Sequence, residues 1–211
     1  ILPLRNNVLF PGVVIPITLG RDKSIKLIQD AYKGNKIIGV VSQKDSNIEE
    51  PLYADLFKIG TVAQIIRMLK MPDGSSTIII QGKKRLKLVE ELATDPYIVA
   101  KIEEFEEKRL KKMSKESLAL FDSLKDLALD IIKNSPNIPS EAAFAIKNIE
   151  SPNFLVNFIS SHMNAEVDEK QKMLQEPDIH LRAKLLMKHL NKELQMLELK
   201  NDIQTRVKSD L

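Results

Sequence analysis

The sequence predicts an α+β fold, in which a β-rich amino-terminal half precedes an all-α half that ends in a long helix. Two observations carry this prediction. Through the first half, β-branched apolar runs alternate with turn residues, as in strands joined by tight turns. From Glu103 onward, apolar residues recur every three to four positions, which indicates amphipathic helices. We therefore expect two domains, residues 1–108 and residues 109–211.

Strands and one short helix fill the expected first domain. Pro16 places the run Val13–Leu19 at a sheet edge or a bulge, because proline has no N–H for a strand ladder. Between Arg21 and Lys33 the apolar spacing predicts a helix, which the pair Gly34-Asn35 ends. The other expected strands are residues 37–41, 60–70, 77–80, 86–88 and 97–102.

A β-hairpin is expected around Pro72-Asp73-Gly74, between two β-branched runs. Proline presets the turn, aspartate can accept a hydrogen bond from its own backbone, and glycine adopts a positive φ. We expect Gly82 to interrupt the second strand of this hairpin.

The second half is expected to be a helical bundle. In residues 115–133, Phe121, Leu124, Ala128 and Ile131 form one stripe. Ser151-Pro152 combines an N-cap residue with a proline at the first helical position, so a helix should begin there. Two further helices are expected at residues 140–149 and 168–175.

The longest expected helix, residues 178–211, follows the N-cap residue Asp178. At about 1.5 Å per residue it spans roughly 45–50 Å, more than the diameter of a small domain. Its apolar stripe shifts along its length, so the second part should lie beyond the neighbouring helices. The first stripe comprises Leu186, Leu190, Leu194 and Leu197, and the second Met196, Leu199, Ile203 and Val207. No glycine or proline ends the pattern, and the chain begins with Ile, so we expect a piece of a larger protein.

The composition is typical of a soluble folded protein. The chain has 43% apolar and 29% charged residues, no cysteine and a net charge of +3. The lack of cysteine excludes thiolate metal sites and suits a reducing compartment, so we expect a cytoplasmic protein without a signal peptide. No run approaches the roughly 18 apolar residues of a membrane span.

No motif predicts catalysis or metal binding. His162, His180 and His189 lack metal-ligand spacing, and no phosphate loop, nucleophile elbow or dinucleotide fingerprint is present. We therefore expect no catalytic residue, no metal and no cofactor in this chain.

One basic cluster allows an alternative function. Lys83, Lys84, Arg85 and Lys87 could contact phosphates on nucleic acid, with affinity that falls as salt rises. Aromatic residues for base stacking are absent beside the cluster, and a strand with one solvated face is the favoured explanation.

Apolar residues near two expected turns are candidate binding residues. They are Leu9, Phe10 and Pro11 at the first turn, and Met68, Leu69, Met71 and Pro72 at the hairpin. Methionine suits surfaces that accept varied apolar partners. These side chains form either an exposed patch or part of the core, and for Phe10 we expect exposure.

The sequence resembles the amino-terminal domain of the ATP-dependent Lon protease family. The similarity is carried by "LPLRNNVLFPGVVIPITLGRDKSI", "DLFKIGTVAQIIRMLKMPDG" and, in the second half, "AFAIKNIESPNFLVNFISSHM" and "LLMKHLNKELQMLELKNDIQTRV". It covers essentially the whole chain.

The resemblance implies a PUA-like β-rich domain followed by a helical bundle. In this family these parts precede an ATPase module, which uses ATP and Mg, and a protease module with a serine–lysine dyad, neither of which is present here. It implies recognition of unfolded, damaged or tagged proteins and assistance in hexamer assembly. A third hypothesis is that this region has a purely structural role, in which it only assembles and spaces the subunits of the ring.

Overall fold

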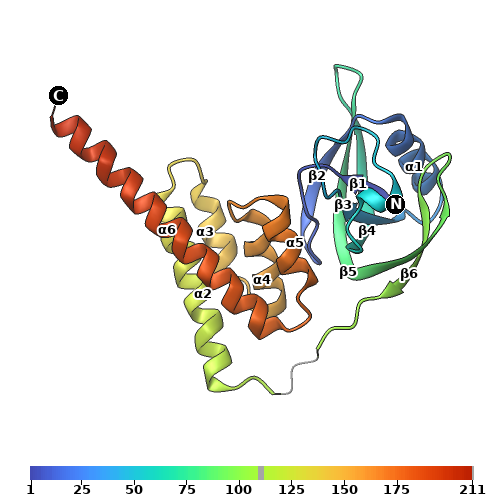
Figure 1. Cartoon of the computed structure of the whole chain (residues 1–211). Helices are drawn as coiled ribbons and strands as arrows, with labels where there is room; N and C mark the ends of the chain where they lie inside the picture. Colours follow the sequence, from blue (N-terminus) through green and yellow to red (C-terminus); the bar gives the residue numbers. More distant parts are fainter. Residues whose placement is uncertain (109–111, 211) are drawn as a thin grey trace. The chain divides into compact units, whose positions relative to one another are not determined.

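The computed structural model describes residues 1–108 and 112–210 of the chain (Figure 1). Contacts divide these residues into two compact units. The sheet unit comprises Ile1–Glu106 and Ala165–Gln175, and the helical unit comprises Glu107–Asn164 and Glu176–Leu211. The α+β class and the long final helix predicted from the sequence are therefore confirmed.

A mixed sheet dominates the sheet unit. Its strands run in the order β1-β3-β4-β5-β2, and β6 pairs with β5. Only the β1–β3 pair is parallel among the described strands. The elements are β1 (Leu2–Leu4), β2 (Val14–Leu19), α1 (Asp22–Lys33), β3 (Ile37–Ser42), a 3-10 turn (Tyr53–Asp55), β4 (Ile59–Lys70), β5 (Ser76–Ala93), β6 (Val99–Glu104) and α5 (Val167–Gln175).

Two strand assignments differ from the sequence prediction. The short strand β1 was not expected, because three residues carry no readable alternation and its pairing partner lies in β3. The expected break at Gly82 was wrong, since β5 continues through this residue as one 18-residue strand. A glycine inside a strand also marks a close approach by another backbone segment, and this is its role here.

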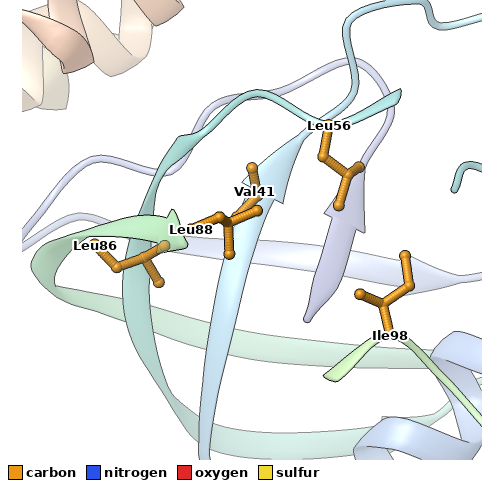
Figure 2. Packing of buried hydrophobic residues seen from close by; sticks show 5 residues of the cluster. All are labelled: Val41, Leu56, Leu86, Leu88 and Ile98. Atoms are coloured by element: carbon orange, nitrogen blue, oxygen red, sulfur yellow. The ribbon is translucent and has the colours of Figure 1, made fainter. Parts of the chain in front are cut away.

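The core of the sheet unit is formed by inward-facing side chains of the central strands. Ile78 and Ile80 of β5 have no exposed surface, and Ile65 of β4 is almost fully buried. Figure 2 shows a second group of buried side chains, contributed by segments that are distant in sequence: Val41, Leu56, Leu86, Leu88 and Ile98. Burying such side chains is worth about 1.5–3 kcal/mol each, so this core holds the strands in register.

The helical unit contains α2 (Lys115–Asn134), α3 (Ser140–Lys147), α4 (Pro152–His162) and α6 (Ile179–Ser209). All four residues of the predicted α2 stripe are buried. The predicted caps are present as well, since Ser151 Oγ accepts from Phe154 N and Asp178 accepts from the first N–H groups of α6.

Helix α6 extends past its neighbours within the helical unit (Figure 1). Leu186 and Leu190 are buried, whereas the second predicted stripe of α6 is solvent-exposed. Met196 is 66% exposed, and Leu199, Ile203 and Val207 are each 54% exposed. The predicted exposure of the second stripe is confirmed, whereas of the first stripe only Leu186 and Leu190 are buried and Leu194 and Leu197 are half-buried.

Helix α5 corrects the predicted domain division. The segment 168–175 was placed in the helical half, but it belongs to the sheet unit. Arg85 Nη1 donates to Leu174 O at 2.7 Å, and Gln171 Nε2 donates to Ile59 O at 2.9 Å. The guanidinium therefore satisfies a carbonyl of the last turn of α5, where the helix carries partial negative charge.

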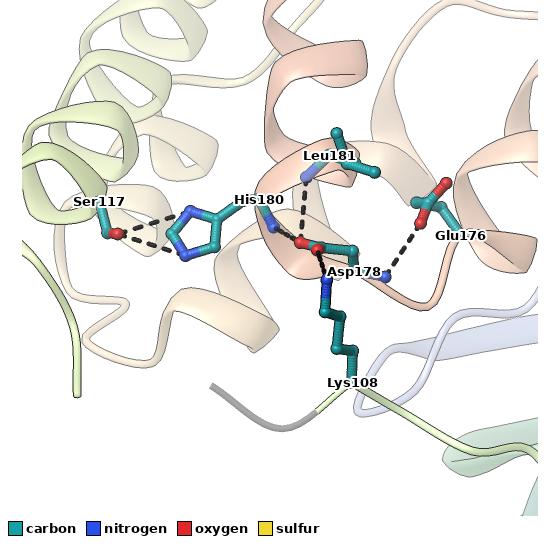
Figure 3. Close-up of polar contacts among 6 residues, drawn as sticks. All are labelled: Lys108, Ser117, Glu176, Asp178, His180 and Leu181. Atoms are coloured by element: carbon teal, nitrogen blue, oxygen red, sulfur yellow. Dashed lines mark hydrogen bonds and ion pairs between the residues drawn. The ribbon is translucent and has the colours of Figure 1, made fainter. Parts of the chain in front are cut away.

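A polar network fixes the start of α6 (Figure 3). Asp178 Oδ1 accepts from His180 N at 2.9 Å and Leu181 N at 3.4 Å, while its Oδ2 accepts from Lys108 Nζ at 3.1 Å. The hydrogen bond from Lys108, followed by those from the backbone of His180 and Leu181, lowers the pKa of the Asp178 carboxyl below its ordinary value of 3.8. The ionised carboxylate is thus the form that stabilises the fold.

Two substitutions of Asp178 distinguish the stability that comes from helix capping from the stability that comes from the carboxylate charge. Asp178→Ala is expected to lower stability by about 1 kcal/mol at neutral pH because the cap is lost. Asp178→Asn keeps a capping oxygen and should cost less, because Lys108, the partner in the lost ion pair, is 74% exposed to solvent. Since the folded-state pKa is depressed, the advantage of wild type over Asp178→Asn is present above about pH 4 and is lost as the pH falls through the folded-state pKa. Urea unfolding at several pH values measures this difference, and an equal gap at pH 2.5 and pH 6 would contradict it.

Candidate functional site

The first predicted turn is present, but its apolar residues are core residues. Phe10 has no exposed surface and Leu9 is 2% exposed, so the expectation that they form an exposed patch was wrong. Pro11 and Gly12 form the turn itself, in which Val13 N donates to Phe10 O at 3.2 Å and Gly12 has φ of 79°. A proline followed by a residue with positive φ is the pattern of a type II turn.

Close backbone contact with β5 explains this burial. Gly12 N donates to Gly82 O and Gly82 N donates to Val13 O, each at 2.9 Å. A Cβ on Gly82 would overlap Phe10 O and lie 3.2 Å from Pro11 Cα. From β4, Thr61 Oγ1 donates to Leu9 O at 2.7 Å. The turn is therefore bound onto the sheet, and the sequence signal that indicated this was the glycine inside β5.

The second predicted turn, at the β4–β5 hairpin, has the expected geometry and is exposed. Gly74 has φ of 87°, and Asp73 Oδ1 accepts from Ser75 N at 2.9 Å and Ser75 Oγ at 2.6 Å. These two hydrogen bonds lower the pKa of the Asp73 carboxyl. Met71 is 44% exposed and Pro72 is also exposed, so this tip presents apolar groups to solvent in a fixed turn.

Strand register separates the other two candidate residues of the hairpin. Met68 pairs with the buried Ile78, so it lies on the inner face and is only half-buried near the open end of the hairpin. Leu69 of β4 pairs with Thr77 of β5, and Thr77 pairs on its other side with Thr18 of β2. The hydroxyls of Thr77 and Thr18 lie 3.4 Å apart and are exposed. Leu69 therefore lies on the outer face, because directly paired residues share a face.

Further apolar residues join Leu69 on that face. Two positions along β5 from Thr77, Ile79 pairs with Arg67 of β4 on one side and with Pro16 of β2 on the other. Val14, at the other end of β2, is 49% exposed. The register of β4 shifts between Ile65 and Arg67, so Ile66 is an extra bulged residue and is 51% exposed. We name this surface the apolar outer face and define it as Val14, Pro16, Ile66, Leu69 and Ile79, with Met71 at the hairpin tip.

Sequence reasoning missed most of this face. The adjacent pair Ile65-Ile66 breaks strict alternation in a strand with one buried side, which is the available signal for a bulge. For Val14, only the pairing register shows which way the side chain points.

The basic cluster does not present four cations. Arg85 is 3% exposed, because it binds Leu174 O and its Cζ lies 4.2 Å from the ring centroid of Phe105. Lys84 pairs with Glu104 at 3.5 Å. The remaining exposed charges, Lys83 and Lys87, make a weak phosphate-binding surface, so the nucleic-acid alternative is not supported.

A serine and a histidine meet in the helical unit, without the geometry of a catalytic triad (Figure 3). Ser117 Oγ lies 3.2 Å from His180 Nε2 and 3.5 Å from its Nδ1, so both ring nitrogens approach the same hydroxyl. Asp178 contacts the backbone of His180 rather than its ring. An imidazole that acts as a general base needs its second nitrogen held by another group, and this ring is not held that way.

Among residues 1–108 and 112–210, no group of three or more histidine and acidic side chains could hold a metal ion. No helix within the same residues combines the length and apolarity required to cross a bilayer.

Comparison with known proteins identifies the family. The sequence pattern described as "ATP-dependent protease La (LON) substrate-binding domain" matches residues 1–192 of the chain. The chain belongs to this family. Over its full length it is 59% identical to Lon protease of Flavobacterium johnsoniae and 49% identical to that of Cytophaga hutchinsonii, and in each case it spans 26% of the relative. The chain thus covers about a quarter of the curated Lon proteases that it matches.

Solved structures show the same fold. The N-terminal domain of Lon protease from the Mycobacterium avium complex superposes with a TM-score of 0.73 at 17% identity, covering 90% of this chain and 96% of that domain. A Lon N-terminal domain protein from Xanthomonas campestris gives a TM-score of 0.62 at 18% identity, covering 88% and 94%. At these identities the comparison shows the fold alone, and this fold is the one seen in the two Lon amino-terminal domains.

The contact between Gly82 and the first turn predicts a position-specific stability loss. In Gly82→Ala the added Cβ meets backbone atoms that cannot rotate away, so we expect a loss of about 2–3 kcal/mol. Gly20→Ala is the matched control, because a Cβ there has no neighbour within 4 Å. Chemical unfolding compares the two variants, and equal stabilities would refute the role assigned to Gly82.

The Arg85 contact predicts that α5 depends on one buried cation. Arg85→Met is expected to destabilise the sheet unit by about 2 kcal/mol, because a charge-assisted hydrogen bond is lost. It should also speed amide hydrogen exchange along α5. Lys84→Met, next to it in β5 but exposed, should change stability by less than about 0.5 kcal/mol. Unaltered protection of α5 in Arg85→Met argues against this anchoring role.

Proposed function

We propose that this chain is the substrate-recognition region of an ATP-dependent Lon protease and that the apolar outer face binds unfolded protein segments. The observation that carries the proposal is the exposure of Ile66 and Met71 on the β4–β5 hairpin, in a chain that belongs to the Lon substrate-binding family. Unfolded or damaged proteins expose apolar segments that native proteins bury, so an apolar surface distinguishes the two states without reading sequence.

The expected affinity of one such surface is low. Removing about 100 Å² of apolar area from water contributes about 2.5 kcal/mol, before the cost of ordering the bound chain. The basic side chains Arg67 and Lys70 border the face and allow acidic residues beside an apolar segment. Low affinity suits reversible capture, and several copies in one assembly raise the effective affinity through avidity.

The remaining functions are proposed for the parent protease. We infer a hexameric cytoplasmic enzyme in which ATP and Mg serve an ATPase module and a serine–lysine dyad cleaves the substrate. The long helix α6 then connects the recognition region with those modules. Within this chain, the proposed work is binding rather than catalysis.

Surface substitutions on the apolar outer face test this function. In Ile66→Ser with Met71→Ser, photo-cross-linking of the chain to a permanently unfolded protein is expected to fall about tenfold or more, since two buried apolar contacts are lost. Leu92→Ser is the matched control, because Leu92 is 61% exposed on β5 but lies outside the apolar outer face.

The salt dependence separates this mechanism from charge-driven binding. Apolar capture should be nearly constant between low and moderate ionic strength, whereas phosphate-type contacts weaken steeply. Undiminished cross-linking in the double variant removes the apolar outer face as the binding surface. If substrate turnover by the parent protease is also undiminished, the structural role in spacing the ring is favoured.

A further inference from the structure

A cavity of about 580 Å³ lies between the two outermost strands of the sheet. It is lined by β1, the loop that follows it, β2 and the start of α1. Because β1 and β2 stand at opposite ends of the order β1-β3-β4-β5-β2, the sheet curls until its two edges face each other across this cavity. The cavity shares Pro16 with the apolar outer face and none of its other residues, and nothing in the proposed function uses it.

Two arginines line the cavity, and among the described residues neither forms an ion pair. Arg21 donates to Gln43 Oε1, and Gln43 Nε2 donates to Asp45 O at 3.1 Å and Ile48 O at 2.9 Å, which fixes the amide. Arg5 is exposed at the other side of the cavity. Among the carboxylates that the structure describes, none forms an ion pair with Arg5 or Arg21.

The positive charge of Arg5 acts on Arg21, which lines the same cavity. Burial and then the charge of Arg5 lower the pKa of Arg21, while Glu50 acts in the opposite direction. Glu50 does not line this cavity but lines an adjoining pocket together with Arg21 and Ser24. A bound anion would therefore relieve a repulsion that no acidic side chain inside the cavity relieves.

Ser24 offers a further donor to the cavity. The residue is 6% exposed and lines the cavity, and none of the hydrogen bonds found in residues 1–108 and 112–210 involves its hydroxyl. The Ser24 oxygen is not one of the buried polar atoms that lack a partner, so it is open to solvent in the cavity and can donate to a ligand there.

The start of α1 adds further donors on the same side. Arg21 is the N-cap residue, but no side chain caps the helix, and the first intrahelical bond runs from Ile25 N to Arg21 O. The N–H groups of the first turn therefore lack intrahelical acceptors, and a helix amino terminus carries partial positive charge. Ser24, the third residue of α1, belongs to this turn.

We propose that this cavity binds an oxyanion, a carboxylate or phosphate group, between the guanidinium groups of Arg5 and Arg21, with the Ser24 hydroxyl as a further donor. Arginine binds both groups through paired N–H donors, and these charge-assisted hydrogen bonds are stronger than neutral ones. The cavity also contains Pro3 and Ile17, and it is larger than a bare ion, so the oxyanion is the end group of a larger molecule.

Titration of the 211-residue chain tests the proposal with three probes. These are inorganic phosphate, a short N-acetylated peptide with a free carboxyl terminus, and the same peptide as its amide. The readout is the backbone amide shift of residues 20–25 at constant ionic strength. Phosphate, the acidic peptide or both are expected to give saturable shifts, and the amide is expected to give none.

Three variants show whether the response comes from this cavity. Arg5→Gln and Ser24→Ala are each expected to weaken binding, Arg5→Gln by about tenfold or more, because a charge-assisted contact is lost. Lys26→Gln, which removes a charge from the exposed side of α1 and does not line the cavity, should bind as wild type does. Circular dichroism verifies that the variants are folded. Arg5→Gln is expected to fold normally, because Arg5 is an exposed loop residue.

The outcomes are distinct. Saturation by phosphate alone assigns a phosphate ligand, and saturation by the acidic peptide but not its amide assigns a peptide carboxyl terminus. Absence of a saturable shift with every probe overturns the proposal, as does equal affinity in wild type, Arg5→Gln and Ser24→Ala. The variant Ile66→Ser with Met71→Ser should titrate normally, so a failure of the proposed apolar capture leaves this result independent.

Discussion

The close approach of the first turn to Gly82 determines how the sheet unit is organised. Two backbone hydrogen bonds join Gly82 to Gly12 and Val13, and they form only because no side chain separates the two segments. The contact brings Leu9 and Phe10 into the core and positions β2 alongside β5. The outward row of β2 and the bulged part of β4 then share one face, so the surface that we assign to substrate binding depends on this contact.

The apolar outer face and the cavity between β1 and β2 use opposite physical principles. The face consists of apolar side chains such as Ile66, and its contacts are insensitive to sequence. The cavity is lined by cationic and hydroxyl donors, which in our proposal orient one oxyanion group. A chain with both can contact a substrate weakly over a surface while a separate ligand occupies a specific position near the start of α1.

Local sequence signals predicted the elements well, and long-range contacts explain the errors. The hairpin turn at Pro72 and the helix starts at Ser151 and Asp178 were predicted correctly, because each depends on residues within three or four positions. Phe10 was misplaced because its burial depends on a glycine about 70 residues later in the chain. Of the candidate surface, the sequence indicated the exposed tip at Met71 but not Val14 or Ile66, since strand register decides which way those side chains point.

Helix α5 has a consequence for how this protein can be dissected. The chain leaves the sheet unit after Glu106, returns for the segment 165–175, and then leaves again, so no single cut separates the two units cleanly. A fragment ending at Glu106 lacks the helix whose Leu174 carbonyl accepts from Arg85, so the buried guanidinium loses this acceptor. A self-contained version of the β-rich part requires the later segment to be fused to it through a linker. The order of segments in such a protein would differ from that in the natural chain.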